Sequence, residues 1–196
     1  MICVNRNEVQ APFITYGYLN LVKDFRNLMT QLAYLTRAYM VAVYSGFGNE
    51  ESIANRLYDL PNKFKEKAEL IFGTPLSEEF LTLLSLHVVH IQTLVNAIKS
   101  GDQATADYSS QQLYKNADDI AAHYARMNPF WDETQWKALL YNYVGMIIQD
   151  AVALGSREFE KDLDIFDRML LGALAMGDYQ AEGFIQYLTA TRRDVV

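Results

Sequence analysis

The spacing of apolar residues is the feature of this sequence that most constrains its fold. Between residues 28 and 43, apolar side chains recur at steps of three and four, at Leu28, Leu32, Leu35, Tyr39 and Val43. This period is typical of a helix that buries one stripe of its surface. The alternation expected of strands is not sustained anywhere in the sequence. The pattern therefore predicts an all-α protein.

Glycine, proline and helix-capping residues divide the helical pattern at regular intervals. We expect six helices, at about 19–45, 50–72, 77–99, 103–126, 133–154 and 157–189. Short turns make successive helices antiparallel neighbours. The prediction is an up-and-down antiparallel helical bundle of three helical hairpins, forming one domain over 19–189. Residues 1–18 are predicted to be an N-terminal extension and residues 190–196 a C-terminal tail.

Individual residues sharpen these boundaries. Asn49 is predicted to cap the second helix and Ser77 the third, because short polar side chains accept from free amides at helix starts. Pro61 is predicted to kink the second helix or to break it near Leu60, because proline lacks the amide hydrogen.

Composition separates the helices into two groups. The first, third and fifth are apolar nearly all round and are predicted to be central. The second, fourth and sixth carry more charge and are predicted to pack outside. In the sixth helix, Glu158, Glu160, Lys161 and Asp162 are expected to lie on the charged, outer side.

The charge balance argues against two classes of partner. The chain has 17 Lys and Arg against 24 Asp and Glu, a net charge of −7. Nucleic acids and anionic membranes bind clustered Lys and Arg, so we expect neither as a partner. No apolar run reaches the length of a membrane span and no secretory signal is evident, which predicts a cytoplasmic protein. The single cysteine, Cys3, allows no internal disulfide.

The sequence contains none of the common catalytic motifs. It lacks the Glu-x-x-His pairs of di-iron bundles, His-Glu-x-x-His, a glycine-rich phosphate loop and Gly-x-Ser-x-Gly. We therefore predict no cofactor. What remains is a set of polar residues in apolar surroundings, which are the candidate ligand-binding residues: Arg37, His87, His90, Asn116, Tyr143 and Asp167.

The histidines allow a metal site but do not favour one. His87 and His90 are spaced so that they could supply two ligands from one helix, yet a stable site needs further ligands from facing helices. A simpler expectation is that His87 is a neutral imidazole, hydrogen-bonded to a neighbouring helix and kept neutral by burial. His123 is expected to be structural. We predict no bound metal.

Arg37 lies in the middle of a helix between apolar residues. If it is buried it must be paired, because an unpaired buried charge costs several kcal/mol. The sequence predicts that it pairs with one of four acids in other helices, namely Asp118, Asp119, Asp150 or Asp167.

Several short motifs are similar to those of one bacterial family. They are Phe25-Arg26, Leu35-Thr36-Arg37, Arg56-Leu57, the His87 helix, Ala97 to Gly101, Tyr114 to Ala121, Asn128-Pro129, Asp167 and Met176-Gly177-Asp178. Over roughly residues 25–188 the chain resembles small helical bacterial proteins that are often mislabelled acetylglutamate kinase. The resemblance implies a helical bundle and no kinase activity, since nothing in the sequence would cradle a nucleotide phosphate.

The resemblance also implies a histidine on each of four helices. The matching positions are Leu32, His87, Tyr143 and Gly172, of which His87 alone is a histidine. A four-histidine site is therefore impossible in this chain, which resembles a divergent member that has lost the cluster or replaced it with Tyr143 and His90.

Three functions remain open on this reasoning. The first is a non-enzymatic binding or interaction module, which could form homo-oligomers and whose partner is an unknown small molecule or protein. The second is a small-molecule, metal or cofactor binder with a polar core pocket around Arg37, His87, Asn116 and Asp167. The third is an enzyme that takes an acid–base pair from that pocket. Convergence of those four residues on one cavity would favour the second and third functions; separation would favour the first.

Overall fold

The computed structural model describes residues 16–193 and consists of six α-helices, with no strand in that range. The helices are α1 (Tyr16–Ser45), α2 (Glu50–Phe72), α3 (Thr74–Ser100), α4 (Gln103–Met127), α5 (Glu133–Gly155) and α6 (Phe159–Arg193). The predicted all-α fold is confirmed. Helical structure reaches a few residues into the segments assigned to the extension and the tail. Cys3 lies outside the described residues.

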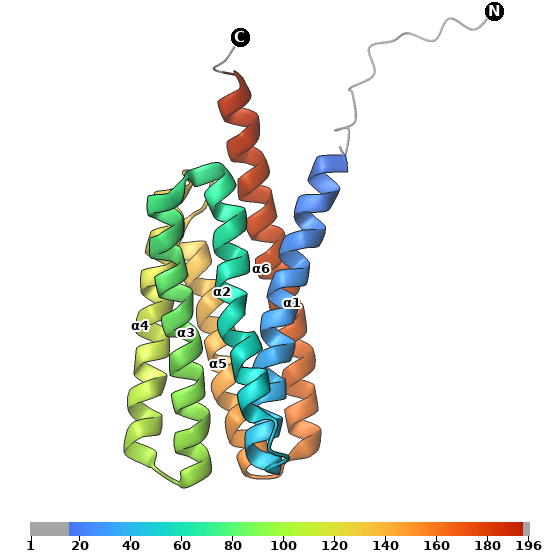
Figure 1. Cartoon of the computed structure of the whole chain (residues 1–196), viewed down its shortest axis with the longest axis vertical. Coiled ribbons are helices and arrows are strands. Elements are labelled where there is room, and N and C mark those ends of the chain that lie inside the picture. The colour runs from blue at the N-terminus through green and yellow to red at the C-terminus, as the bar shows by residue number, and fades with distance from the viewer. Residues whose placement is uncertain (1–15, 194–196) are drawn as a thin grey trace, which may run out of the picture.

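The helices run up and down and form a closed ring (Figure 1). Each helix packs against the next one in the chain, and α6 packs against α1 to close the ring. Three helices, α1, α3 and α5, also contact one another. Their predicted central position is confirmed, because these are the helices that carry apolar residues on most of their surface.

Two of the predicted turns show why the chain reverses where it does. Gly101 has a φ of 74°, a left-handed conformation that glycine adopts without a steric penalty, and its amide donates to the carbonyls of Ala97 and Ile98. The side chain of Asp102 then accepts from the amide of Thr105 and starts α4. Asp132 starts α5 in the same way.

The two helix caps that the sequence predicted, Asn49 and Ser77, are wrong. Asn49 precedes α2 but makes no side-chain capping hydrogen bond. Ser77 lies inside α3, where its hydroxyl donates to the carbonyl of Gly73 at 2.8 Å. The reason is that α3 begins about one turn earlier than predicted, at Thr74, and tolerates Pro75 because the first turn of a helix needs no amide donor.

The predicted break at Pro61 is also wrong, since α2 is continuous from Glu50 to Phe72. Pro61 is buried on the same face as Leu57, Leu60 and Phe64. Burial of that face against the bundle core stabilises the helix by more than the missing hydrogen bond costs.

Two of the central helices, α3 and α5, are long and apolar enough to cross a membrane by length and composition. The core helices of soluble bundles meet the same criterion. In this bundle α3 and α5 both contribute residues to the shared core, including Val95 of α3 and Ile147 of α5.

Candidate functional site

The six candidate residues do not converge on one cavity. His87 of α3 pairs with Asn116 of α4, while Arg37 of α1 pairs with an acid on α6. Asp167 is exposed on α6. Arg37, His87 and Asn116 therefore lie in two separate pairs, which is the arrangement that favours a structural role for these three residues.

The His87 pair is fully defined by its hydrogen bonds. The amide nitrogen of Asn116 donates to the carbonyl of Leu83 at 3.0 Å, so its oxygen faces Nδ1 of His87 at 2.8 Å and accepts a hydrogen from it. Burial lowers the pKa of His87 to about 4, opposed by the hydrogen bond to Asn116 and assisted by the neighbouring His90. The expected hydrogen bond to a neighbouring helix is confirmed, and the lowered pKa agrees with a neutral imidazole.

The space beside this pair is too small for a ligand. The cavity next to His87 has a volume of about 10 Å³ and is lined mainly by apolar side chains, among them Leu32, Phe64 and Leu84. A volume of this size holds about one water molecule at most. His90 is half-buried on the same helix, and burial lowers its pKa as well.

Arg37 is largely buried and paired, but with an acid that the sequence did not predict. Its guanidinium binds the carboxylate of Asp162 on α6, and the two side chains are 20% and 3% exposed. The guanidinium also lies over the ring of Phe166, 4.9 Å from its centre. Asp162 was expected to lie on the charged, outer side of its helix, and that expectation is wrong.

The four predicted partners of Arg37 lie elsewhere or bind differently. Asp118 binds Lys137 and the hydroxyl of Tyr141, and Asp119 and Asp167 are exposed. Asp150 of α5 is the exception, because it joins the same cluster without taking the Arg37 hydrogen bond.

Among the described residues, Asp150 is unusual because it is an acidic side chain that is fully buried. Neither of its oxygens makes a hydrogen bond with a described residue, although the carboxyl group of Asp162 adjoins it. Burial and then the adjoining Asp162 raise the pKa of Asp150 to about 8, although Arg37 acts in the opposite direction. This arrangement of two acids beside one guanidinium favours retention of a proton on Asp150.

The aromatic hydroxyls around this cluster are buried as well. Burial, and then the charge of Asp150, raise the pKa of Tyr44 to about 12. The same two causes raise the pKa of Tyr143, whose hydroxyl is buried without a partner among the described residues. Tyr143 lies two helical turns before Asp150 on α5, so it does not join the Arg37 pair.

The third histidine, His123, lies apart from His87 and His90. His123 is buried, stacks on Phe80 and bonds the carbonyl of Leu76 at 2.9 Å, which agrees with its expected structural role. Over residues 16–193, no three His, Cys, Asp or Glu side chains come together as a group that could hold a metal ion.

The four positions that the family resemblance singled out form two neighbouring pairs. Leu32 and His87 line the same small cavity. A Cβ atom added to Gly172 would lie 3.9 Å from the ring of Tyr143. The substituted positions are thus filled by packing, and the family assignment stays a prediction.

Apart from the small cavity beside His87, the structure has an open groove between α1 and α2. It has a volume of about 650 Å³ and is lined by amide and charged side chains, including Gln31, Asn55 and Arg56. Of the candidate residues from the sequence, none lines it. Most of its lining side chains are exposed, so it lacks the enclosure of a typical ligand site.

Sequence reasoning missed the role of Asp162, yet a signal for it was present. On α6 the buried residues Ile165, Met169, Ala173 and Met176 recur at steps of three and four. One step of three back from Ile165 reaches Asp162, which places this acid on the buried face. The run of charges around it concealed that periodicity.

Comparison of the chain with protein-family models, with curated proteins and with solved structures finds no match.

Proposed function

We propose that this chain is a non-enzymatic interaction module, which binds a macromolecular partner on its helical surface. The observation that carries the proposal is the separation of the polar core residues into self-contained pairs. His87 is paired with Asn116 and Arg37 with Asp162, and the cavity beside His87 holds no more than a water molecule. The buried hydroxyl of Tyr143 and the buried carboxyl group of Asp150 have no hydrogen-bond partner among the described residues, but neither residue lines the cavity beside His87 or the groove between α1 and α2.

The surface supports the same proposal. Several large apolar side chains are exposed in the described residues, among them Tyr34, Leu163 and Leu171. Contiguous apolar surface on a soluble protein commonly marks an interaction site. The net charge of −7 favours a protein partner over nucleic acid or an anionic membrane. A cytoplasmic location is proposed with it, and a homo-oligomer would be one form of such binding.

Two measurements test this proposal against a binder that uses its core. Native mass spectrometry of the purified full chain should give the mass of the bare chain. Photo-cross-linking in cells, from a benzoylphenylalanine placed at exposed Leu171, should give one discrete protein adduct. A small molecule retained at one equivalent and lost in a His87→Gln variant would contradict the proposal and favour a core binding site.

A further inference from the structure

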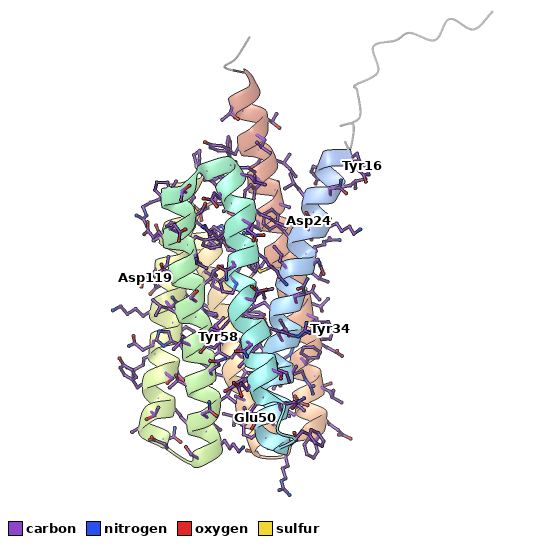
Figure 2. All side chains as sticks on the ribbon, in the orientation of Figure 1. Tyr16, Asp24, Tyr34, Glu50, Tyr58 and Asp119 are labelled. Atoms are coloured by element: carbon purple, nitrogen blue, oxygen red, sulfur yellow. The ribbon has the colours of Figure 1, made fainter. Side chains whose placement is uncertain are left out.

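An apolar stripe follows the outer seam between α6 and α1. It consists of Phe159, Leu163, Phe166, Leu170 and Leu174 of α6 together with Tyr34 of α1, and is called the apolar seam below. The α6 members recur at steps of four, three, four and four, so they share one face. Tyr34, labelled in Figure 2, joins them through an edge contact with Phe166, with ring centres 5.3 Å apart.

The apolar seam is open to solvent although its members are apolar. Leu163 is 55% exposed, Phe159 60% and Tyr34 54%, while Phe166 and Leu170 are half-buried and form the floor. The seam extends over 16 residues of α6, from Phe159 to Leu174, which corresponds to about 24 Å of helix. A surface of this shape, a floor between two helices, is suited to receive a third helix.

A row of acidic side chains borders the apolar seam on the side away from α1. Glu160, Asp164 and Asp167 each follow a seam residue by one position, and all three are exposed. None of them has a side-chain ion pair with another described residue. These three residues are called the acidic row, and their spacing of four and three matches that of the seam beside them.

We infer that the apolar seam and the acidic row together bind a basic amphipathic helix of a partner protein, an inference that rests on the proposed function. The apolar face of the helix would cover the seam. Its Lys or Arg residues, along one edge, would meet the three unpaired carboxylates. Charge complementarity of this kind fixes orientation and suppresses wrong partners.

The same charges disfavour the other occupants of such a surface. In a two-fold antiparallel pair of α6 helices, the acidic row of one copy would face the acidic row of the other. An anionic lipid surface would be repelled as well. The exposed pair Leu86 and Val89 on α3 provides a contrast, because its helical neighbours Thr82 and Thr93 are uncharged.

The experiment uses the full chain and a fluorescein-labelled helical peptide of about 18 leucine and lysine residues, long enough to cover the seam. Fluorescence anisotropy should show saturable binding that weakens with added salt. The double variant Leu163→Ser/Leu174→Ser should bind at least about tenfold more weakly, because two apolar contacts of the seam are lost.

Two further variants separate charge from apolar contact. Asp164→Asn/Asp167→Asn should bind about fivefold more weakly at low salt and lose most of the salt dependence. The matched control Leu86→Ser/Val89→Ser should bind within about twofold of the original chain. A peptide with glutamate in place of lysine should not bind. Circular dichroism of each variant should show the same helical signal as the original chain.

Four results would overturn the inference. Equal weakening in the α3 control would mean that the peptide binds without regard to the seam. A dimer in sedimentation velocity that Leu163→Ser/Leu174→Ser abolishes would make a second copy the occupant. Flotation of the chain with phosphatidylcholine vesicles, lost in the same variant, would make it a lipid surface. If the peptide does not bind but a discrete cross-linked adduct forms in cells, the inference of a basic helical partner is wrong, while the proposed function as an interaction module stands.

Discussion

Asp150, Asp162 and Arg37 place two acids and one base in a buried position where α1, α5 and α6 meet. Ionisation of both acids would leave an uncompensated negative charge away from water, which costs several kcal/mol. Burial and the adjoining Asp162 raise the pKa of Asp150, and a proton retained there would remove that charge. The cluster is therefore complete only with its proton, and the stability of the fold must depend on pH.

The substitution Asp150→Asn tests this dependence. The pKa of Asp150 is about 8 in the folded chain and about 4 when unfolded. The folded state therefore binds more protons between these values, and the free energy of unfolding must fall as pH rises from 4 to 8. An asparagine side chain at this position has nearly the same shape and does not titrate. Because each pKa unit corresponds to about 1.4 kcal/mol, we expect equal stability near pH 5 and a gain on the order of 4 kcal/mol at pH 8.5, measured by urea unfolding.

The exposed acid Asp119, on the outer surface of α4 in Figure 2, provides the matched control. The free energy of unfolding of the Asp119→Asn variant should equal that of the original chain both near pH 5 and at pH 8.5. An Asp150→Asn variant that loses stability with rising pH as steeply as the original chain would show that another group carries the dependence.

Substitution of Arg37 tests the other half of the cluster. Arg37→Ala should cost about 3–5 kcal/mol, because the carboxylate of Asp162 is then buried without a partner. Arg26→Ala is the control, since its pair with Asp178 is nearly half exposed and should contribute far less to stability than the buried pair. Urea unfolding at pH 6 measures both. Asp162→Asn in the Arg37→Ala background should recover part of the loss; no recovery would contradict the pairing.

At the scale of single residues, the sequence predicted that Arg37 forms a buried ion pair, but it did not predict which acid is the partner. Arg37 lies between Leu35 and Tyr39, and a buried guanidinium in such apolar surroundings needs a carboxylate partner. The structure has that partner. The choice among acids depends on which faces of α5 and α6 turn inward. That orientation is fixed by packing of the whole bundle, so a local charge pattern misplaced Asp162. His87 was predictable because burial alone determines its neutral state.

At the scale of elements, the packing of α6 against α1 depends on a close backbone approach. A Cβ atom added to Gly177 would lie 2.8 Å from the Cα atom of Arg26 and 2.9 Å from its nitrogen. These are backbone atoms of α1 and cannot move without shifting the helix. Glycine is therefore required at this position for α1 and α6 to lie as close as they do.

Gly177→Ala and Gly145→Ala should have effects of opposite sign. Alanine favours a helix over glycine by about 1 kcal/mol. At Gly145 the nearest atom to the added Cβ is the hydroxyl of Tyr114 at 3.4 Å, so we expect a gain of up to about 1 kcal/mol. At Gly177 the clash should outweigh that gain and cost about 1–3 kcal/mol. Thermal unfolding compares the two; stabilisation by Gly177→Ala would contradict the close approach.

The helices themselves were largely predictable, because their apolar period and turn residues are local features. The residues that cap the starts of α2 and α3 were harder to predict. Asn49 and Ser77 are good capping residues by type, but a cap forms only where the backbone presents free amides. Pro61 shows the same limit, since the packing of the face that contains Leu57 and Leu60 overrides a local signal to end the helix.

At the scale of the whole molecule, one hydrophobic core joins all six helices. It includes residues from every helix, and closure of the ring by α6 against α1 leaves no helix packed on one side alone. Composition predicted the three central helices. It did not predict the closure, because the contact between the first and last helices joins segments that no local pattern relates.

A single core predicts that the bundle unfolds as one unit. Trp131 and Trp136 are both buried where α4 turns into α5, so their fluorescence reports that end of the molecule. Asp150 lies 14 residues after Trp136, about 21 Å along α5. Far-ultraviolet circular dichroism reports all six helices together. In urea at pH 8.5 the two signals should change at the same midpoint, as expected for a two-state transition.

Asp150→Asn makes this test stronger, because it changes the opposite end of α5 from the two tryptophans. If the bundle is one cooperative unit, the gain in stability should move the fluorescence and dichroism midpoints by the same amount. A fluorescence midpoint that stays in place while the dichroism midpoint shifts would divide the bundle into two units. The shared core argues against that division, since Tyr143 and Ile147 connect the two ends of α5 through one continuous buried face.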